Sequence, residues 1–158
     1  MKTGLLTVEK NNMKFMVFIL VLSILSCNKT VGKKNAADKT AEVKQLKCVE
    51  HIFTSDSILG EVRNHASEKV SLSQSIMTYT EELESLDFSN CPEKFTSAFR
   101  QHIEAWKMVM QVSDKYPSLR GELHSIFAEL EKSKDSTEFK YLVKQVWDTW
   151  NLAEQYAQ

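Results

Sequence analysis

The chain contains few of the residues that interrupt helices and lacks the alternation that makes strands. Only two prolines and four glycines occur among its 158 residues. No stretch alternates cleanly between apolar and polar residues, which is the pattern of a half-buried strand. Apolar residues recur instead at intervals of three and four positions, a spacing that places them on one face of a helix. The pattern predicts an all-α fold, an up-down antiparallel bundle of four or five helices, because short connections make neighbouring helices antiparallel.

Catalytic and cofactor motifs are also absent from the sequence. It contains no G-x-S-x-G nucleophile elbow and no glycine-rich phosphate loop. It contains neither the C-x-x-C-H motif of covalent haem nor the H-E-x-x-H motif of zinc proteases. Residues 51–158 hold 11 basic and 17 acidic residues, whereas nucleic acids require a concentrated basic surface. We therefore expect a protein that is not an enzyme and that does not bind nucleic acid.

One long apolar run occurs at residues 15–25, with Ser23 as its single polar residue. The run is shorter than the roughly 20 residues that a membrane-spanning helix needs. It fits the apolar region of a secretory signal peptide, which spans roughly 7–15 residues and follows a positive charge such as Lys14. Ser26 and Cys27 follow the run, and polar residues come directly after them.

The four residues Ile24-Leu25-Ser26-Cys27 resemble the lipobox of bacterial lipoproteins. The resemblance implies that the chain is cleaved before Cys27 and that this cysteine is acylated. Two or more acyl chains hold a protein stably at a membrane, whereas one holds it only marginally. In this family a residue other than aspartate after the cysteine, here Asn28, favours the outer membrane. The expected location is therefore the bacterial cell envelope, on a lipid anchor in the outer membrane with the domain facing the periplasm.

Three segments follow from these observations. Residues 1–26 are predicted to be the signal peptide, and residues 27–47 the acylated cysteine with a flexible tether, partly helical toward its end. This tether is polar and has few large apolar side chains, a composition that does not form a packed core. Residues 48–158 are predicted to form the helical bundle, which resembles no family that we recognise.

The second half of the bundle has clear helix boundaries. Asn90 is expected to cap a helix that has Pro92 in its first turn and Glu93 three residues after the cap, the capping-box arrangement. This helix is expected to end near Lys115, because Pro117 disfavours helical geometry at the residue before it. The side chains on its predicted inner face are Phe95, Phe99, His102, Trp106, Val109 and Ser113.

Two further helices follow. Pro117 is expected to open the first of them, since proline is tolerated in the first turn of a helix, and this helix is expected to end near Lys132. Asp135 with Glu138 three residues later predicts a capping box at the start of the last helix. The inner face of that last helix is predicted to carry Phe139, Leu142, Val143, Val146, Trp150, Ala153 and Tyr156.

The segment at residues 67–71 leaves two arrangements open. Ser55 or Asp56 is expected to begin a helix, and residues 67–71 are either the middle of one helix of about 31 residues or a turn between two shorter ones. In both arrangements two apolar faces are predicted, one with Ile58, Leu59, Val62 and Ala66, the other with Leu72, Ile76, Tyr79, Leu83 and Leu86.

The same alternative decides whether Cys48 and Cys91 can pair. A continuous helix of that length would be about 45 Å long, and the segment between it and Cys48 is too short to return over that distance. If the chain folds back near residues 69–70, residues whose numbers sum to about 139 lie level, and Cys48 and Cys91 satisfy this condition. In an oxidising compartment they are then candidates for a disulfide.

His102 is the candidate ligand of a metal ion or haem. It lies between Phe99 and Trp106 on a predicted inner face, and a helical bundle with inward-facing His and Met side chains can hold haem. His65, also predicted to face inward, and Met77 are the candidate second ligands. The competing interpretation is a histidine at the edge of the core that bonds to a neighbour.

The combined expectation is a lipid-anchored envelope protein that is not an enzyme. It would contact a protein partner of the envelope or bind a small apolar ligand in a groove between helices. The alternative is a haem- or metal-binding helical bundle that uses His102.

Overall fold

The computed structural model describes residues 36–157, and within that range the chain is all-helical and has no strand. Its elements are α1 (Ala36–Ala66), α2 (Leu72–Glu84), α3 (Glu93–Ser113), α4 (Leu123–Leu130) and α5 (Ser136–Tyr156). The predicted all-α bundle is confirmed. The signal peptide, Cys27 and the first part of the tether lie outside the described residues, so their predictions stay predictions.

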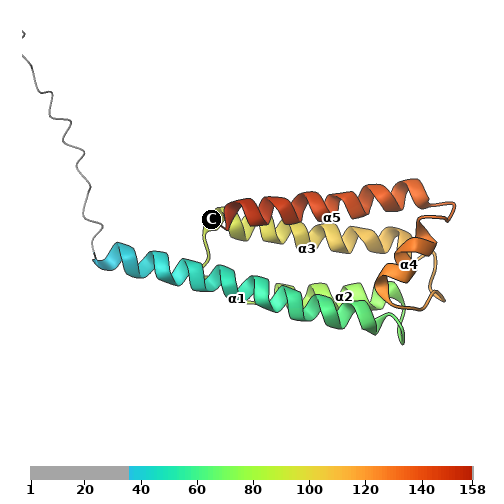
Figure 1. The fold of residues 1–158 in the computed structure, drawn as a ribbon, viewed down its shortest axis with the longest axis horizontal. Helices are drawn as coiled ribbons and strands as arrows, with labels where there is room; N and C mark the ends of the chain where they lie inside the picture. The colour runs from blue at the N-terminus through green and yellow to red at the C-terminus, as the bar shows by residue number, and fades with distance from the viewer. Residues whose placement is uncertain (1–35, 158) are drawn as a thin grey trace, which may run out of the picture. The chain divides into compact units, whose positions relative to one another are not determined.

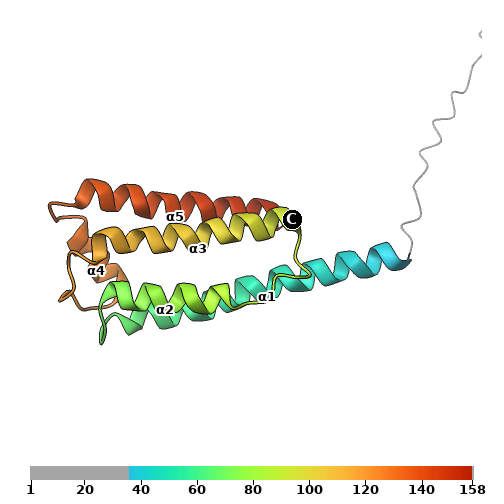
Figure 2. The same cartoon turned by 180° about the vertical axis from the view of Figure 1, so that it is seen from behind.

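Four long helices run up and down, and the short α4 lies across one end (Figures 1 and 2). Helix α3 packs against both α2 and α5, and α1 packs against α2 and α4. Residues 36–157 belong to one compact unit, which contains all five helices. None of the helices within residues 36–157 combines the length and the hydropathy that crossing a membrane requires.

The core is built from aromatic and aliphatic side chains of all five helices. Phe53 of α1 contacts the rings of Phe95 and Trp150, at centroid distances of 5.3 and 5.2 Å, and so joins α1 to α3 and α5. Burial of each such side chain contributes roughly 1.5–3 kcal/mol. The largest side chains with almost no exposure include Phe95, Phe99, Phe139, Ile52, Ile76, Leu83, Ile103, Ile126 and Leu130.

Helix α1 begins at Ala36, so the predicted start at Ser55 or Asp56 is wrong. The helix also includes residues 36–47, most of the segment predicted as tether, whose partial helicity was expected only toward its end. The side chains of residues 37–47 are exposed, and α1 extends beyond the other helices in both views (Figures 1 and 2). The segment at residues 36–47 contains three Ala and three Lys, together with one Glu, one Gln and one Leu, and all of these residues have a high intrinsic helix propensity.

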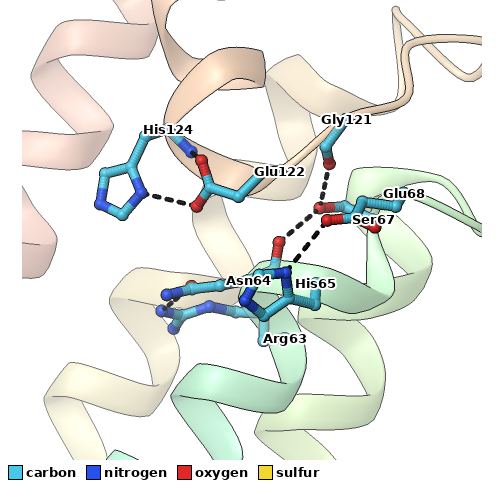
Figure 3. A network of polar contacts seen from close by, with 8 residues as sticks. All are labelled: Arg63, Asn64, His65, Ser67, Glu68, Gly121, Glu122 and His124. Atoms are coloured by element: carbon cyan, nitrogen blue, oxygen red, sulfur yellow. Dashed lines mark hydrogen bonds and ion pairs between the residues drawn. The ribbon is translucent and has the colours of Figure 1, made fainter.

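The chain folds back between α1 and α2, so the turn is the arrangement found at residues 67–71. Ser71 caps α2, and its hydroxyl accepts a hydrogen bond from the backbone N–H of Gln74 at 3.2 Å. Ser67 is fully buried and donates from its hydroxyl to the carbonyl oxygen of Gly121 at 2.8 Å (Figure 3). The turn is therefore attached to the loop that precedes α4.

That attachment explains why α4 is shorter than predicted. The helix begins at Leu123 rather than at Pro117, because Gly121 takes part in the contact with Ser67 through both of its backbone groups. Gly121 has a φ of 153°, a conformation that is essentially restricted to glycine. Helical geometry starts only after Glu122, whose carboxylate accepts from the N–H of His124 at 2.9 Å.

Two other predicted helix caps differ from the structure. Helix α3 starts after Pro92, not after Asn90, because the N–H of Cys91 closes a turn onto the carbonyl of Phe88 at 3.0 Å. Asp135 does precede α5, but its carboxylate forms no cap. It binds Lys115 and Tyr116 at the end of α3 instead, so it joins two helices.

Candidate functional site

Cys48 and Cys91 form a disulfide bond in the structure, with their Cα atoms 5.1 Å apart. Cys48 is the first buried residue of α1, after the exposed residues 37–47, and Cys91 lies just before α3. The bond therefore attaches the connection between α2 and α3 to the side of α1, as the fold-back arrangement requires. It is a structural link at one end of the bundle.

His102 is buried in the core, with 3% of its surface exposed. Trp106 donates a hydrogen bond from its indole N–H to Nε2 of His102 at 3.1 Å. Nε2 is therefore an acceptor, so Nδ1 carries the proton and donates to the carbonyl oxygen of Val146 at 3.1 Å. Burial lowers the pKa of His102 to about 4. Both ring nitrogens are thus occupied in a neutral imidazole, which leaves neither of them for a metal ion.

The other two predicted ligands lie at the surface. His65 is exposed and pairs with Glu68 through Nδ1 at 3.0 Å, so its predicted inward orientation is wrong. Met77 lies on α2 with 38% of its surface exposed. No three His, Cys, Asp or Glu side chains within residues 36–157 gather as a metal site would require. His65 and Met77 are therefore exposed, whereas His102 is buried, and this arrangement does not support the predicted haem or metal site.

His65 faces solvent because α1 buries a different face from the one that the sequence predicted. Ile58 and Val62, which were predicted to face the core, are 58% and 60% exposed. The buried positions of α1 are instead Cys48, Val49, Ile52, Gly60 and Arg63.

The buried face of α1 includes Arg63, which was not predicted to lie in the interior. It is only 8% exposed. Its guanidinium carbon lies 4.3 Å from the centroid of the Tyr79 ring and 3.8 Å from that of Trp106. These two rings are 5.7 Å apart at an angle of 80°. The distance between the two rings is smaller than the sum of their distances to the guanidinium carbon. The rings therefore lie on adjacent sides of the cation, not on opposite sides, and form a corner around it.

The hydrogen bonds of Arg63 are incomplete. Nη2 donates to Oδ1 of Asn64 at 3.1 Å (Figure 3). Nε and Nη1 are buried and have no hydrogen-bond partner among residues 36–157. None of the ion pairs in that part of the chain includes Arg63. Burial lowers the pKa of Arg63, opposed by Tyr79 and Asp56, but a guanidinium stays protonated in proteins.

Asp56 is the acidic residue whose charge acts on this cation, and its carboxylate accepts a hydrogen bond from Tyr79. The hydroxyl of Tyr79 donates to Oδ1 of Asp56 at 2.5 Å. Burial raises the pKa of Asp56, while the bond from Tyr79 and the charge of Arg63 act in the opposite direction. Asp56 therefore offsets part of the charge of Arg63 through space without satisfying its N–H groups.

A cavity of about 490 Å³ opens beside Arg63. Helices α4 and α5 form most of its wall, α1 contributes Arg63 and Asn64, and α3 contributes Trp106. His124 and Glu131, both exposed, are its charged or titratable groups besides Arg63. The apolar side chains that line it are Trp106, Leu123, Phe127, Ala128, Val143, Val146 and Trp147.

A second cavity of about 260 Å³ adjoins the first. Arg63, Trp106, Val146 and Trp147 line both, so Arg63 stands at the boundary between them. His102 lines the second cavity, as does Asp56. The candidate site is therefore an apolar, aromatic cavity between helices with one incompletely bonded cation in its wall.

No protein-family model, curated protein or solved structure matches this chain. The class that the described residues define is an all-helical bundle with an arginine-bearing apolar cavity.

Proposed function

We propose that the protein is a lipid-anchored helical bundle of the bacterial envelope that binds a small apolar ligand and catalyses no reaction. The observation that carries this proposal is the cavity of about 490 Å³ between α4 and α5. Ligand sites in proteins span roughly 300–1,000 Å³ and are lined mainly by apolar and aromatic side chains with a few polar groups. The cavity beside Arg63 has this size and this lining.

The sequence around Cys27 supports the location. The lipobox-like residues 24–27 imply an acylated N-terminal cysteine, and the exposed part of α1 at residues 37–47 adds a helical spacer of about 17 Å. A ligand-binding bundle held on such a spacer would meet ligands in the compartment next to the membrane. Contact with another envelope protein stays a prediction.

Replacement of Cys27 tests the anchor. We expect the full chain to fractionate with membranes and its N-terminal peptide to carry the mass of the acyl chains, since two chains anchor a protein stably. The Cys27→Ser variant should lack that mass, whereas Thr30→Ala, three residues downstream, should keep it. An unmodified Cys27 in the wild-type protein would overturn this part of the proposal.

Filling the cavity tests ligand binding. The chain from residue 34, exported so that Cys48 and Cys91 pair, is titrated with the uncharged dye N-phenyl-1-naphthylamine, whose fluorescence rises in apolar sites. Saturable binding is expected. Ala128→Phe places a ring inside the cavity, because Ala128 lines it, and should weaken binding at least about tenfold through lost apolar burial.

Glu129→Phe is the matched control, since it adds the same ring one residue further along α4 outside the cavity. It should leave dye binding unchanged. Absence of saturable binding to the wild-type chain, or an equal loss in both variants, would contradict the proposed function.

A further inference from the structure

We propose that the ligand of this cavity carries a single negative charge, a carboxylate on an apolar body, and that Arg63 binds the carboxylate. This inference rests on the proposed function, because it names the chemical class of the ligand that the same cavity takes.

The first argument is the state of Arg63 itself. A guanidinium has five N–H donors, and within residues 36–157 Arg63 donates one hydrogen bond, to Asn64. Nε and Nη1 are buried without a partner among the described residues. Buried polar groups in proteins are nearly always hydrogen-bonded, and an unpaired buried donor is destabilising, more so when it is charged. An anion in the cavity, which Arg63 and Asn64 line, would offset this buried charge, and Nη2 keeps a second N–H beyond its bond to Asn64.

The second argument is the direction from which an anion can approach. Tyr79 and Trp106 form a corner against one side of the guanidinium, at 4.3 and 3.8 Å from its carbon atom. These contacts hold the cation in place by attraction to the ring faces and leave Nε and Nη1 without a hydrogen-bond partner among residues 36–157. Because Arg63 also lines both cavities, a ligand in either of them lies next to its side chain.

The third argument selects the charge of the ligand. Arg63 is the one permanent cation among the residues that line the larger cavity, and Glu131 adds a carboxylate to the same wall. A single arginine matches a carboxylate, which a guanidinium binds through charge-assisted hydrogen bonds. A dianion such as a phosphate monoester would leave one charge unmatched and would face Glu131. The remaining wall is apolar and aromatic, so the rest of the ligand should be apolar.

The test compares three ligands that share one ring system. 2-Naphthoate, 2-naphthalenemethanol and 2-naphthyl phosphate are titrated by calorimetry into the chain from residue 34 with its disulfide formed. We expect naphthoate to bind at least about tenfold more tightly than the alcohol, as a hydrogen-bonded charge contributes in a buried site, and more tightly than the phosphate.

Two arginine variants locate the effect. Arg63→Met should weaken naphthoate binding at least about tenfold and remove the preference for naphthoate over the alcohol. Arg100→Met, which removes an exposed arginine of α3 that does not line this cavity, should change neither. Helical circular dichroism checks that the variants are folded, and the comparison of ligands on the wild-type chain needs no variant.

Each outcome has one meaning. Equal affinity for the acid and the alcohol, or tighter binding of the phosphate, would overturn the inference and leave the proposed function standing. Binding of none of the three ligands, together with no dye binding, would overturn the proposed function as well. Loss of acid binding in Arg100→Met as large as in Arg63→Met would also contradict the inference.

Discussion

Replacing Cys91 by serine is expected to lower the free energy of unfolding by about 4 kcal/mol. The bond between Cys48 and Cys91 closes a loop whose ends are 43 residues apart. A link over such a loop removes much of the conformational freedom of the unfolded chain, which is the origin of the stabilisation in the chain-entropy description. The measurement is urea denaturation of the chain from residue 34 under oxidising conditions.

Cys48→Ser should give the same loss, because either substitution opens the same loop. Treatment of the wild-type chain with a reducing agent should lower its stability to that of the variants and should not affect the variants. A difference of less than about 1 kcal/mol between oxidised wild type and variants would show that the link does not constrain the unfolded state as its span implies.

Acid is expected to destabilise the bundle through His102. The folded protein holds this imidazole neutral, because burial lowers its pKa to about 4, whereas an unfolded histidine titrates at about 6.5. Between these two pH values the unfolded state binds more protons than the folded state. Stability therefore rises with pH in this window, and the contribution of neutral His102 is lost as the pH falls from about 6.5 to 4.

The size of this loss is about 3 kcal/mol, from the difference between the two pKa values. Denaturation curves at pH 7 and at pH 4 measure it. His102→Gln should be less stable at pH 7, but its stability should fall less between the two pH values. His124→Gln, which replaces an exposed histidine, should keep the wild-type dependence. A His102→Gln variant with the full wild-type dependence would contradict a buried neutral imidazole.

The helices that the sequence predicts best are those with a strong apolar face of their own. The predicted inner face of α3 includes Phe95, Phe99, His102, Trp106 and Val109, and all of them are buried. The regular spacing of these residues is a local property of the chain, so it can be found without any knowledge of the partners of the helix.

The turn at residues 67–71 depends on contacts that local patterns do not contain. Ser67 bonds to Gly121, which is 54 residues away in the sequence. The same contact removes residues 117–122 from the helix that Pro117 was expected to begin. Helix boundaries that depend on such distant pairs remain ambiguous in the sequence. The turn at residues 67–71 is one of them, and it decides whether Cys48 can reach Cys91.

The candidate site was missed because α1 offers two apolar faces. Ile58 and Val62 suggested one phase, whereas the face of α1 that is buried in the bundle carries Ile52 and Arg63. An arginine on the buried face of a helix is unexpected from composition, since arginine is rarely buried without a partner. The signal that could have indicated it is the spacing of Val49, Ile52, Gly60 and Arg63, which share one helical face.

A crystal structure of the chain from residue 34 with 2-naphthoate tests the central claim most directly. The account predicts the ring system between α4 and α5 beside Trp106 and Trp147, with a carboxylate oxygen about 2.7–2.9 Å from a guanidinium nitrogen of Arg63. Density for the ligand elsewhere, or in the cavity with its carboxylate away from Arg63, would contradict it.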